Sequence, residues 1–433
     1  MAGNEVQLDY FAEHLAQVNK NNQVLASDNI CNQQGAIIVT KGQEITPQVA
    51  RQLALHKLIS PLHSSINLKQ VRNSKQMCDA LIGRLNEIGF APMIKKFDLF
   101  KEIIYQLNNV CSYPMVGLKL TILAERFPSI FNRELISAVI ALAICRELKL
   151  KDEVVQTIFI ATLLSETGLL HIDPAIAQKD GDFSPEEWRF YQGHVAISKS
   201  FADHVPNLSP RVGLAIIEHH ERSDGFGYPF QKSGDQLCIE SRIIAKVGTI
   251  SAIYRKRVLA EGYSFSVIIP ILQLNSSQNT QDVNNAALRV LSNVTVPAQE
   301  IDEARILTLI PKLLSLAQRL NKWLSHARVI AKEFKTELQH PSVTMHIAQY
   351  EKLNSILNSS GLLSPHQVDW LEGIAKNKTK KDYHVVEQYA VMLYELEYHC
   401  LRVKRNFEPV IPIVFSNSVK FKEMNEELHQ LLL

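Results

Sequence analysis

The feature that most constrains this sequence is a helical spacing of apolar residues, which runs from Lys75 to the end of the chain. Apolar residues recur three and four positions apart, and the alternation typical of half-buried strands is scarce. Ser-Pro pairs at Ser184, Ser209 and Ser364 add helix starts, because a serine hydroxyl caps free backbone N–H groups and proline suits the first helical position. The pattern predicts a mainly α fold.

The segment before Lys75 differs in having signals for an extended strand and a turn as well as for a helix. An extended run, Gly35–Thr40, leads into a turn, and Thr46-Pro47 then predicts a short helix that ends near Leu55. We therefore expect a small N-terminal α/β module.

The chain is long enough for several domains. At roughly 100 to 200 residues per domain, 433 residues should form two to four units. A polar interval from Asn275 to Asn285 has no apolar period and indicates a boundary, and beyond it an apolar stripe predicts a helical bundle in which Pro311 kinks or breaks a helix. The expected parts are a small N-terminal α+β module (1–74), a helical connector (75–130), a central helical domain (131–296) and a C-terminal helical bundle (297–433).

Composition argues against several classes of protein. With 46 basic and 44 acidic residues the net charge is +2, so no broad field would attract nucleic acid. The longest apolar stretch, Ala138–Cys145, is far shorter than the ~20 residues of a membrane span, and the N-terminus lacks the pattern of a signal peptide. Six cysteines without a CxxC pair fit a reducing compartment. We expect a cytoplasmic protein with no membrane span and no nucleic-acid partner.

The residues that could carry a chemical function lie between Leu163 and Ile253. His194 can border the core, and the helix that begins after Ser209 would point His219 inward, with His220 about 100° around the axis. Two adjacent imidazoles that face neighbouring directions can bind a metal, although an inward histidine is more often a hydrogen-bonded core residue.

A glycine-rich loop follows the histidine pair. The chain reads His219-His-Glu-Arg-Ser-Asp-Gly-Phe-Gly-Tyr-Pro229, where Gly225 and Gly227 allow the backbone angles of a tight loop that can approach a ligand closely.

This loop strongly resembles the signature of the HD-GYP family, bacterial phosphodiesterases that open cyclic di-GMP with a cluster of metal ions. Ser184–Trp188 with Gly193-His194, and Ser241–Ala245 downstream, resemble the flanking helices of that family. The resemblance implies an HD-type helical bundle for the central domain. The N-terminal module is similar to one that often precedes this domain, whereas residues 297–433 show no resemblance to a family that we can name.

The chain departs from the family at its defining positions. The His-Asp dyad, which ligates and bridges the metals, falls at Ser165 and Glu166. A serine hydroxyl is a poor transition-metal ligand beside imidazole, while Glu166 keeps a carboxylate. The family lysine that would neutralise a phosphate is replaced by Leu169.

Further ligand positions of the family are also changed. Its late aspartate aligns with Gly248, a second aspartate with Ser251, and the first-helix ligand with Arg133, a permanent cation that would repel a metal. The expectation is either no metal or one divalent ion (Fe, Mn or Zn), held by His194, His219, His220 and Glu166.

Two metal ions act together on the attacking water and the leaving oxygen, so their loss predicts little or no turnover. The favoured interpretation is a catalytically impaired signalling protein that binds a cyclic dinucleotide, such as cyclic di-GMP, or a protein partner. The resemblance alone implies a diguanylate cyclase (GGDEF-type) domain as partner, and other signalling proteins or a homodimer remain open. The loop residues expected to bind are Arg222, Asp224, Gly225, Gly227, Tyr228 and Pro229.

Three alternatives stay open at this point. The chain could be a weak or active metal-dependent cyclic di-GMP phosphodiesterase, with three histidines and water around one ion. The loop could complete the fold without binding anything. A scaffold related to other degenerate HD-like domains fits the lost dyad but not the intact Gly-Tyr-Pro loop.

Overall fold

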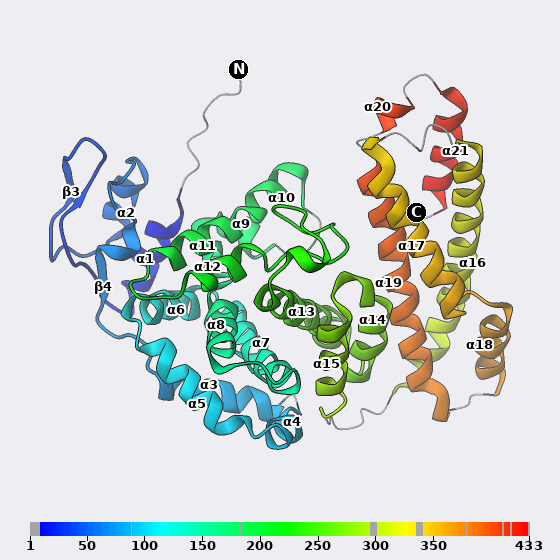
Figure 1. The fold of residues 1–433 in the computed structure, drawn as a ribbon, viewed down its shortest axis with the longest axis horizontal. Helices are drawn as coiled ribbons and strands as arrows, with labels where there is room; N and C mark the ends of the chain where they lie inside the picture. Colours follow the sequence, from blue (N-terminus) through cyan, green and yellow to red (C-terminus); the bar gives the residue numbers. More distant parts are fainter. Residues whose placement is uncertain are drawn as a thin grey trace. The chain divides into compact units, whose positions relative to one another are not determined.

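The computed structural model describes residues 9–87, 89–179, 181, 183–294, 301–334, 341–377, 380–408, 411–415 and 418–431. The mainly α prediction is confirmed, and the few strands lie in the small N-terminal module (Figure 1). The chain forms two compact units, one made of Met1–Ala252 with Ser276–Pro297 and the other of Ile253–Asn275 with Ala298–Leu433. The boundary predicted between residues 296 and 297 lies outside the described residues.

The first unit begins with the expected α/β module. Two antiparallel pairs, β1 with β4 and β2 with β3, form its strands. The hydroxyl of Thr46 accepts a hydrogen bond from the Val49 N–H (3.3 Å), so the predicted cap of the short helix is confirmed. The elements are α1 (Phe11–Val18), β1 (Val24–Ala26), β2 (Ile30–Cys31), β3 (Ile37–Val39), α2 (Pro47–Ala54) and β4 (Ile66–Leu68).

A cluster of polar side chains connects the start of α1 to the helices that follow. Asp9 Oδ1 lies 2.8 Å from His171 Nδ1, and His171 Nε2 lies 2.7 Å from the Nζ of Lys119. The ring of Phe11 stacks on His171 at 4.6 Å. Burial lowers the pKa of Lys119 to about 7.

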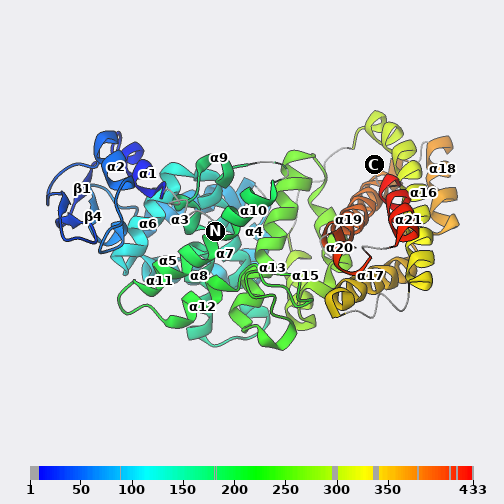
Figure 2. The ribbon, with the colours of Figure 1, turned by 90° about the horizontal axis from the view of Figure 1, so that it is seen from above.

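Two apolar helices form the centre of the first unit. α7 (Pro128–Glu147) and α8 (Asp152–Leu164) pack against each other, and α8 also packs against α12 (Figure 2). The segments Pro128–Glu147 and Asp152–His171 are long and apolar enough to cross a membrane, but 72% and 83% of their most apolar windows are buried inside the protein. Burial of this kind is typical of core helices. The other helices are α3 (Ser74–Glu87), α4 (Ala91–Lys96), α5 (Leu99–Cys111), α6 (Pro114–Arg126), η2 (Thr167–His171), α9 (Pro174–Ala177), α10 (Pro185–Gln192), α11 (His194–Asp203), α12 (Pro210–Ile217), α13 (Ile239–Ile253) and α15 (Gln281–Leu291).

The predicted Ser-Pro helix starts are confirmed at Ser184, Ser209 and Ser364, which precede α10, α12 and α18. The expected extent of one helix was wrong, because α12 ends at Ile217 and His219 lies in the turn beyond it. The imidazole Nδ1 of His219 bonds to the backbone oxygen of Ile216 (2.6 Å), which occupies a carbonyl at the helix end.

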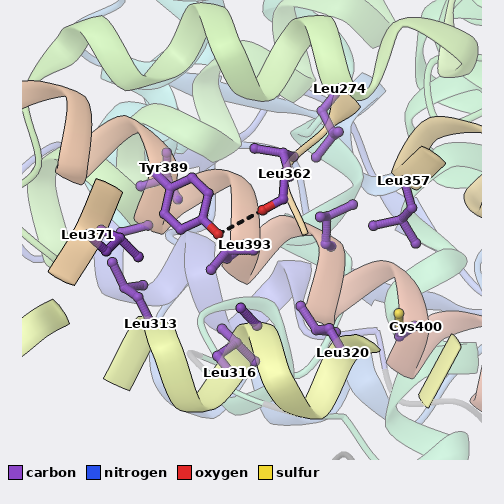
Figure 3. Close-up of a cluster of buried hydrophobic side chains, with 14 of the residues drawn as sticks. Leu274, Leu313, Leu316, Leu320, Leu357, Leu362, Leu371, Tyr389, Leu393 and Cys400 are labelled. Atoms are coloured by element: carbon purple, nitrogen blue, oxygen red, sulfur yellow. Dashed lines mark hydrogen bonds between the residues drawn. The ribbon is translucent and has the colours of Figure 1, made fainter. Parts of the chain in front are cut away.

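The second unit is a helical bundle around a leucine-rich core. Figure 3 shows Leu313, Leu316 and Leu320 of α16 in this core, and the hydroxyl of Tyr389 donates to the backbone oxygen of Leu362 (2.7 Å). Pro311 lies inside α16, so of the expected kink or break the break does not occur. Residues 253–275, which the predicted boundaries place in the central domain, belong to this unit. Its helices are α14 (Ile268–Leu274), α16 (Glu303–Glu333), α17 (Pro341–Ser360), α18 (Pro365–Asn377), α19 (Tyr383–Phe407), α20 (Ile411–Val414) and α21 (Val419–Gln430).

Candidate metal centre

Four side chains from three places in the first unit meet at one point. Glu166 follows α8, His194 begins α11, and His219 and His220 lie in the turn after α12. Each offers a ligand atom, and these atoms lie within 4.8 Å of one another. The fold therefore brings together the four ligands that the sequence proposes.

Hydrogen bonds to the backbone orient two of these imidazoles. Nδ1 of His194 bonds to the Tyr191 oxygen and Nδ1 of His219 to the Ile216 oxygen, both at 2.6 Å. Because a carbonyl only accepts, each Nδ1 carries the proton and each Nε2 keeps its lone pair. Among the described residues the Nε2 atoms of His194, His219 and His220 are buried and have no hydrogen-bond partner. Three buried imidazole nitrogens that converge in this way fit one metal ion.

The electrostatic setting keeps the imidazoles neutral. Burial lowers the pKa of His194, lowers that of His219 to about 4, and holds that of His220 well below its ordinary value. Neutral imidazole is the form that binds a metal. The donor set thus suits a transition metal without prior loss of a proton.

Arg133 of α7 lies beside this cluster. Its Nη2 is 3.0 Å from Glu166 Oε1, and its Nε donates to Glu134 Oε1 at 2.7 Å. Glu134 is buried, and burial raises the pKa of its carboxyl to about 7. The sequence predicts a cation at Arg133, but it gave no reason to expect the carboxylate of Glu134 next to it.

Apart from Glu166, the positions at which the chain departs from the family contribute no ligand to the described cluster. Ser165 is buried and its hydroxyl donates to the Thr162 oxygen (2.9 Å), while Leu169 is a core residue that is 1% exposed. The hydroxyls of Ser137 and Ser251 bond to each other at 2.6 Å. At Gly248 an added Cβ would meet no atom within 4 Å.

Ser198 of α11 holds the turn that carries Glu166. Its hydroxyl donates to the backbone oxygen of Ser165 and accepts from the N–H of Gly168, both at 2.7 Å. A Cβ at Gly168 would lie 2.2 Å from the His194 oxygen, so only glycine permits this close approach. Sequence reasoning missed Ser198, because a serine inside a helix carries no signal of a contact that the fold creates.

Contacts within the Gly-Tyr-Pro loop hold it in its conformation. Gly225 has a φ of 79°, and a Cβ at Gly227 would lie 2.4 Å from the Cα of Glu221. The buried carboxylate of Glu221 accepts from the N–H groups of Phe230 (2.5 Å) and Lys232 (3.0 Å). These contacts explain both glycines as structural requirements of the loop.

Of the predicted loop residues, Tyr228 reaches the cluster. Its ring stacks on that of His220 with centroids 4.7 Å apart and an angle of 23°. The peptide bond between Tyr228 and Pro229 is cis. Arg222 and Asp224 instead form an ion pair with each other, with Nε to Oδ1 at 2.9 Å. The structure therefore brings Tyr228 to the site and leaves the other two polar residues within the loop.

Comparison with known proteins shows a likeness in the central part of the chain, most of which lies in the first unit. The HD domain family matches residues 118–284. The 3′3′-cGAMP-specific phosphodiesterase 3 of Vibrio cholerae is 32% identical over 117 residues, which cover 27% of this chain and 25% of that protein. The cyclic di-GMP phosphodiesterase response regulator RpfG of Xanthomonas campestris is 28% identical over 130 residues, 30% of this chain and 34% of that protein.

A third relative matches a longer segment of this chain. The cyclic di-GMP phosphodiesterase PA4108 of Pseudomonas aeruginosa is 26% identical over 167 residues, 39% of this chain and 40% of that protein. The matched region thus spans between a quarter and two fifths of these relatives. A solved structure, a HDG"Y"P protein (Bd1817) of Bdellovibrio bacteriovorus, covers 51% of this chain and 71% of its own at a TM-score of 0.35 and 14% identity, a likeness too weak to add to the assignment. Residues 118–284 therefore resemble an HD domain, and this part of the chain is similar to HD-GYP-type phosphodiesterases.

Proposed function

We propose that this protein is a signalling module that binds a cyclic dinucleotide at a site with one metal ion, and that it hydrolyses the dinucleotide weakly or not at all. The position of Arg133 carries this proposal. Its guanidinium lies 3.0 Å from Glu166 Oε1, which places a permanent cation beside the carboxylate of the cluster. A second divalent ion next to Glu166 would be repelled by that charge.

The donor set supports a single ion. Three imidazoles with buried, hydrogen-bond-free Nε2 atoms and one carboxylate could hold it. Such an ion would supply Lewis-acid polarisation of a phosphate oxygen. Burial raises the pKa of Tyr228 well above its ordinary value, so its hydroxyl stays protonated and can donate a hydrogen bond.

The positions at which the resemblance implies further ligands do not fit a second ion. Gly248 offers no donor, the hydroxyl of Ser251 is bonded to Ser137, and Leu169 has no charge to hold a phosphate. Without this partner ion, activation of water and stabilisation of the leaving oxygen would not occur together. This supports binding as the main activity.

Two other functions have an observation in their favour. The relatives are named cyclic di-GMP or 3′3′-cGAMP phosphodiesterases, which favours residual hydrolysis at a one-metal site. The exposed side chain of Phe230, next to Pro229, favours a protein partner such as a diguanylate cyclase at the loop. In each case we place the protein in the cytoplasm.

The test combines metal content, binding and hydrolysis. Purified protein and a His194→Ala variant are analysed for bound metal, and each is titrated with cyclic di-GMP under reducing, anaerobic conditions with Mn²⁺ or Fe²⁺. We expect at most one ion per chain, loss of that ion in the variant, binding of the dinucleotide and no turnover. Two ions with turnover would overturn the proposal, and one ion with turnover would favour the phosphodiesterase.

A further inference from the structure

Helix α10 carries aromatic side chains that the core of the first unit does not use. None of its residues is fully buried, and Trp188 is 40% exposed. The ring of Trp188 nevertheless lies nearly parallel to that of Tyr191, with centroids 5.8 Å apart and an angle of 11°. An aromatic ring left in water contributes less to folding than a buried one. The ordered but exposed indole is therefore a candidate for contact with a ligand.

Aromatic contacts connect Trp188 to the metal cluster along two paths. On one path Trp188 meets the edge of Tyr228 (5.5 Å, 77°), which stacks on His220 (4.7 Å). On the other path Trp188 stacks on Tyr191, whose ring lies 5.1 Å from that of His194. On each path a single ring separates the indole from a ligand of the cluster.

We propose that Trp188 stacks on one nucleobase of the cyclic dinucleotide while the adjoining phosphodiester lies at the metal cluster. This inference rests on the proposed function. In a nucleotide one sugar separates the base from its phosphate, which matches the single ring between Trp188 and the cluster. Tyr191 and Tyr228 hold the indole, so little rotational freedom is lost when a base binds.

The chemistry of stacking sets the specificity of this subsite. Every base has a π-face, so an aromatic platform accepts purines without a preference based on hydrogen bonds. Removal of the indole should therefore weaken cyclic di-GMP and 3′3′-cGAMP to a similar extent. A residue that read the base edge would instead affect one of them more than the other.

The closing experiment compares Trp188→Ala and Trp188→Phe in the full-length, metal-loaded protein. Binding of cyclic di-GMP and 3′3′-cGAMP is measured by calorimetry. Since stacking contributes about 1–3 kcal/mol per base, W188A should weaken both about 5- to 150-fold. W188F keeps a flat ring and should recover most of the affinity.

Two controls separate a binding role from a structural one. Metal content and the affinity for dimethyl phosphate, a phosphodiester without bases, should be unchanged in W188A. Tyr105→Ala on α5 removes another aromatic ring, which is 61% exposed, and should leave dinucleotide binding unaltered. Dinucleotide binding should also quench the fluorescence of Trp188 in the wild type, and this quenching should be lost in W188F, which keeps Trp323 and Trp370.

Each outcome decides the proposal. Selective loss of dinucleotide affinity in W188A, with W188F restored, supports stacking. Wild-type affinity in W188A overturns the stacking role and leaves the one-metal binding site intact. Loss of metal or dimethyl phosphate together with the dinucleotide shows that Trp188 covers the cluster and also overturns it. If the wild type binds dimethyl phosphate and neither dinucleotide, the proposed function fails and the base subsite with it.

Discussion

At the scale of single residues, the charge of Arg133 controls the electrostatics of the cluster. One guanidinium contacts the carboxylates of Glu134 (2.7 Å) and Glu166 (3.0 Å). Glu134 is buried, and burial raises its pKa to about 7 even though Arg133 opposes the shift. Two buried carboxylates therefore depend on one cation.

This dependence gives opposite predictions for stability and for metal binding. Arg133→Gln should destabilise the metal-free protein by about 3 kcal/mol, because removal of one partner leaves buried charges uncompensated. The same change should strengthen Mn²⁺ binding, because the cation beside Glu166 is gone. Denaturant unfolding and Mn²⁺ titration measure the two effects, and Arg133→Lys serves as the charged control. Weaker Mn²⁺ binding in the glutamine variant would contradict this account.

His63 gives a prediction for the dependence of stability on pH. Burial, with the nearby charge of Lys119, lowers its pKa from 6.5 to about 3. The unfolded chain then binds the extra proton first, so the contribution of neutral His63 to stability is present above pH 6.5 and is lost as the pH falls toward 3. The destabilisation caused by His63→Gln should shrink by up to about 1.4 kcal/mol per pH unit below 6.5.

Unfolding free energies at pH 7.5 and pH 5.0 test this prediction. The exposed His56, changed to glutamine, is the matched control. A destabilisation by His63→Gln that stays constant between the two values of pH would count against the buried neutral imidazole.

The site residues that could be predicted from the sequence are those that lie in a recognisable local motif. His194, His219, His220 and Glu166 could be found because a long motif fixes their positions, and the fold places them together. Glu134 could not, because its role arises through Arg133, which contacts both Glu134 on α7 and Glu166 in the turn after α8. Such a contact depends on the packing of two helices, which apolar spacing does not specify.

At the scale of elements, the close packing of η2 on α11 sets the distance between Glu166 and His194. Gly168 lies in η2, and the hydroxyl of Ser198 bonds to both sides of the turn at 2.7 Å. Because these contacts are short and buried, a small side chain added here must move one element relative to the other.

Gly168→Ala should therefore separate two of the metal ligands. The added Cβ would lie 2.2 Å from the His194 oxygen, so we expect a loss of about 2 kcal/mol or more in unfolding free energy and much weaker metal binding. Gly83→Ala on α3 is the matched control, because no atom lies within 4 Å of its added Cβ and alanine favours helix. Thermal unfolding and Zn²⁺ titration of both variants check this, and equal behaviour would refute the packing argument.

Helix starts could be predicted from the sequence better than helix ends. Ser184, Ser209 and Ser364 precede their helices as expected, because a capping hydroxyl followed by proline is a local signal. The end of α12 at Ile217 was not foreseen. There a histidine side chain bonds to a backbone carbonyl, a competition that residue spacing does not reveal.

At the scale of the whole molecule, the chain passes from the first unit into the second, returns to the first, and then enters the second again. Residues 253–275 belong to the second unit, although residues on both sides of them belong to the first. The sequence boundaries missed this because a polar interval marks where packing is weak and does not say which core a preceding apolar helix joins.

This arrangement predicts the result of truncation. A chain that stops at residue 297 should expose Val267, Ile271 and Leu274, which are buried in the core of the second unit, and should aggregate. Ile271→Gln should improve the solubility of the truncated chain but destabilise the full chain by about 3 kcal/mol. Size-exclusion chromatography and denaturant unfolding measure the two effects. A soluble, monomeric truncated chain without the substitution would contradict the division into units.

Gly248 and Leu169 differ in how easily each could be replaced by design. An added Cβ at Gly248 would meet no atom within 4 Å, so the first carbon of an aspartate side chain has room there. Leu169 lies in the core at 1% exposure, and a lysine there would bury an uncompensated charge at a cost of several kcal/mol. A carboxylate can therefore be engineered at Gly248 more readily than a cation at Leu169.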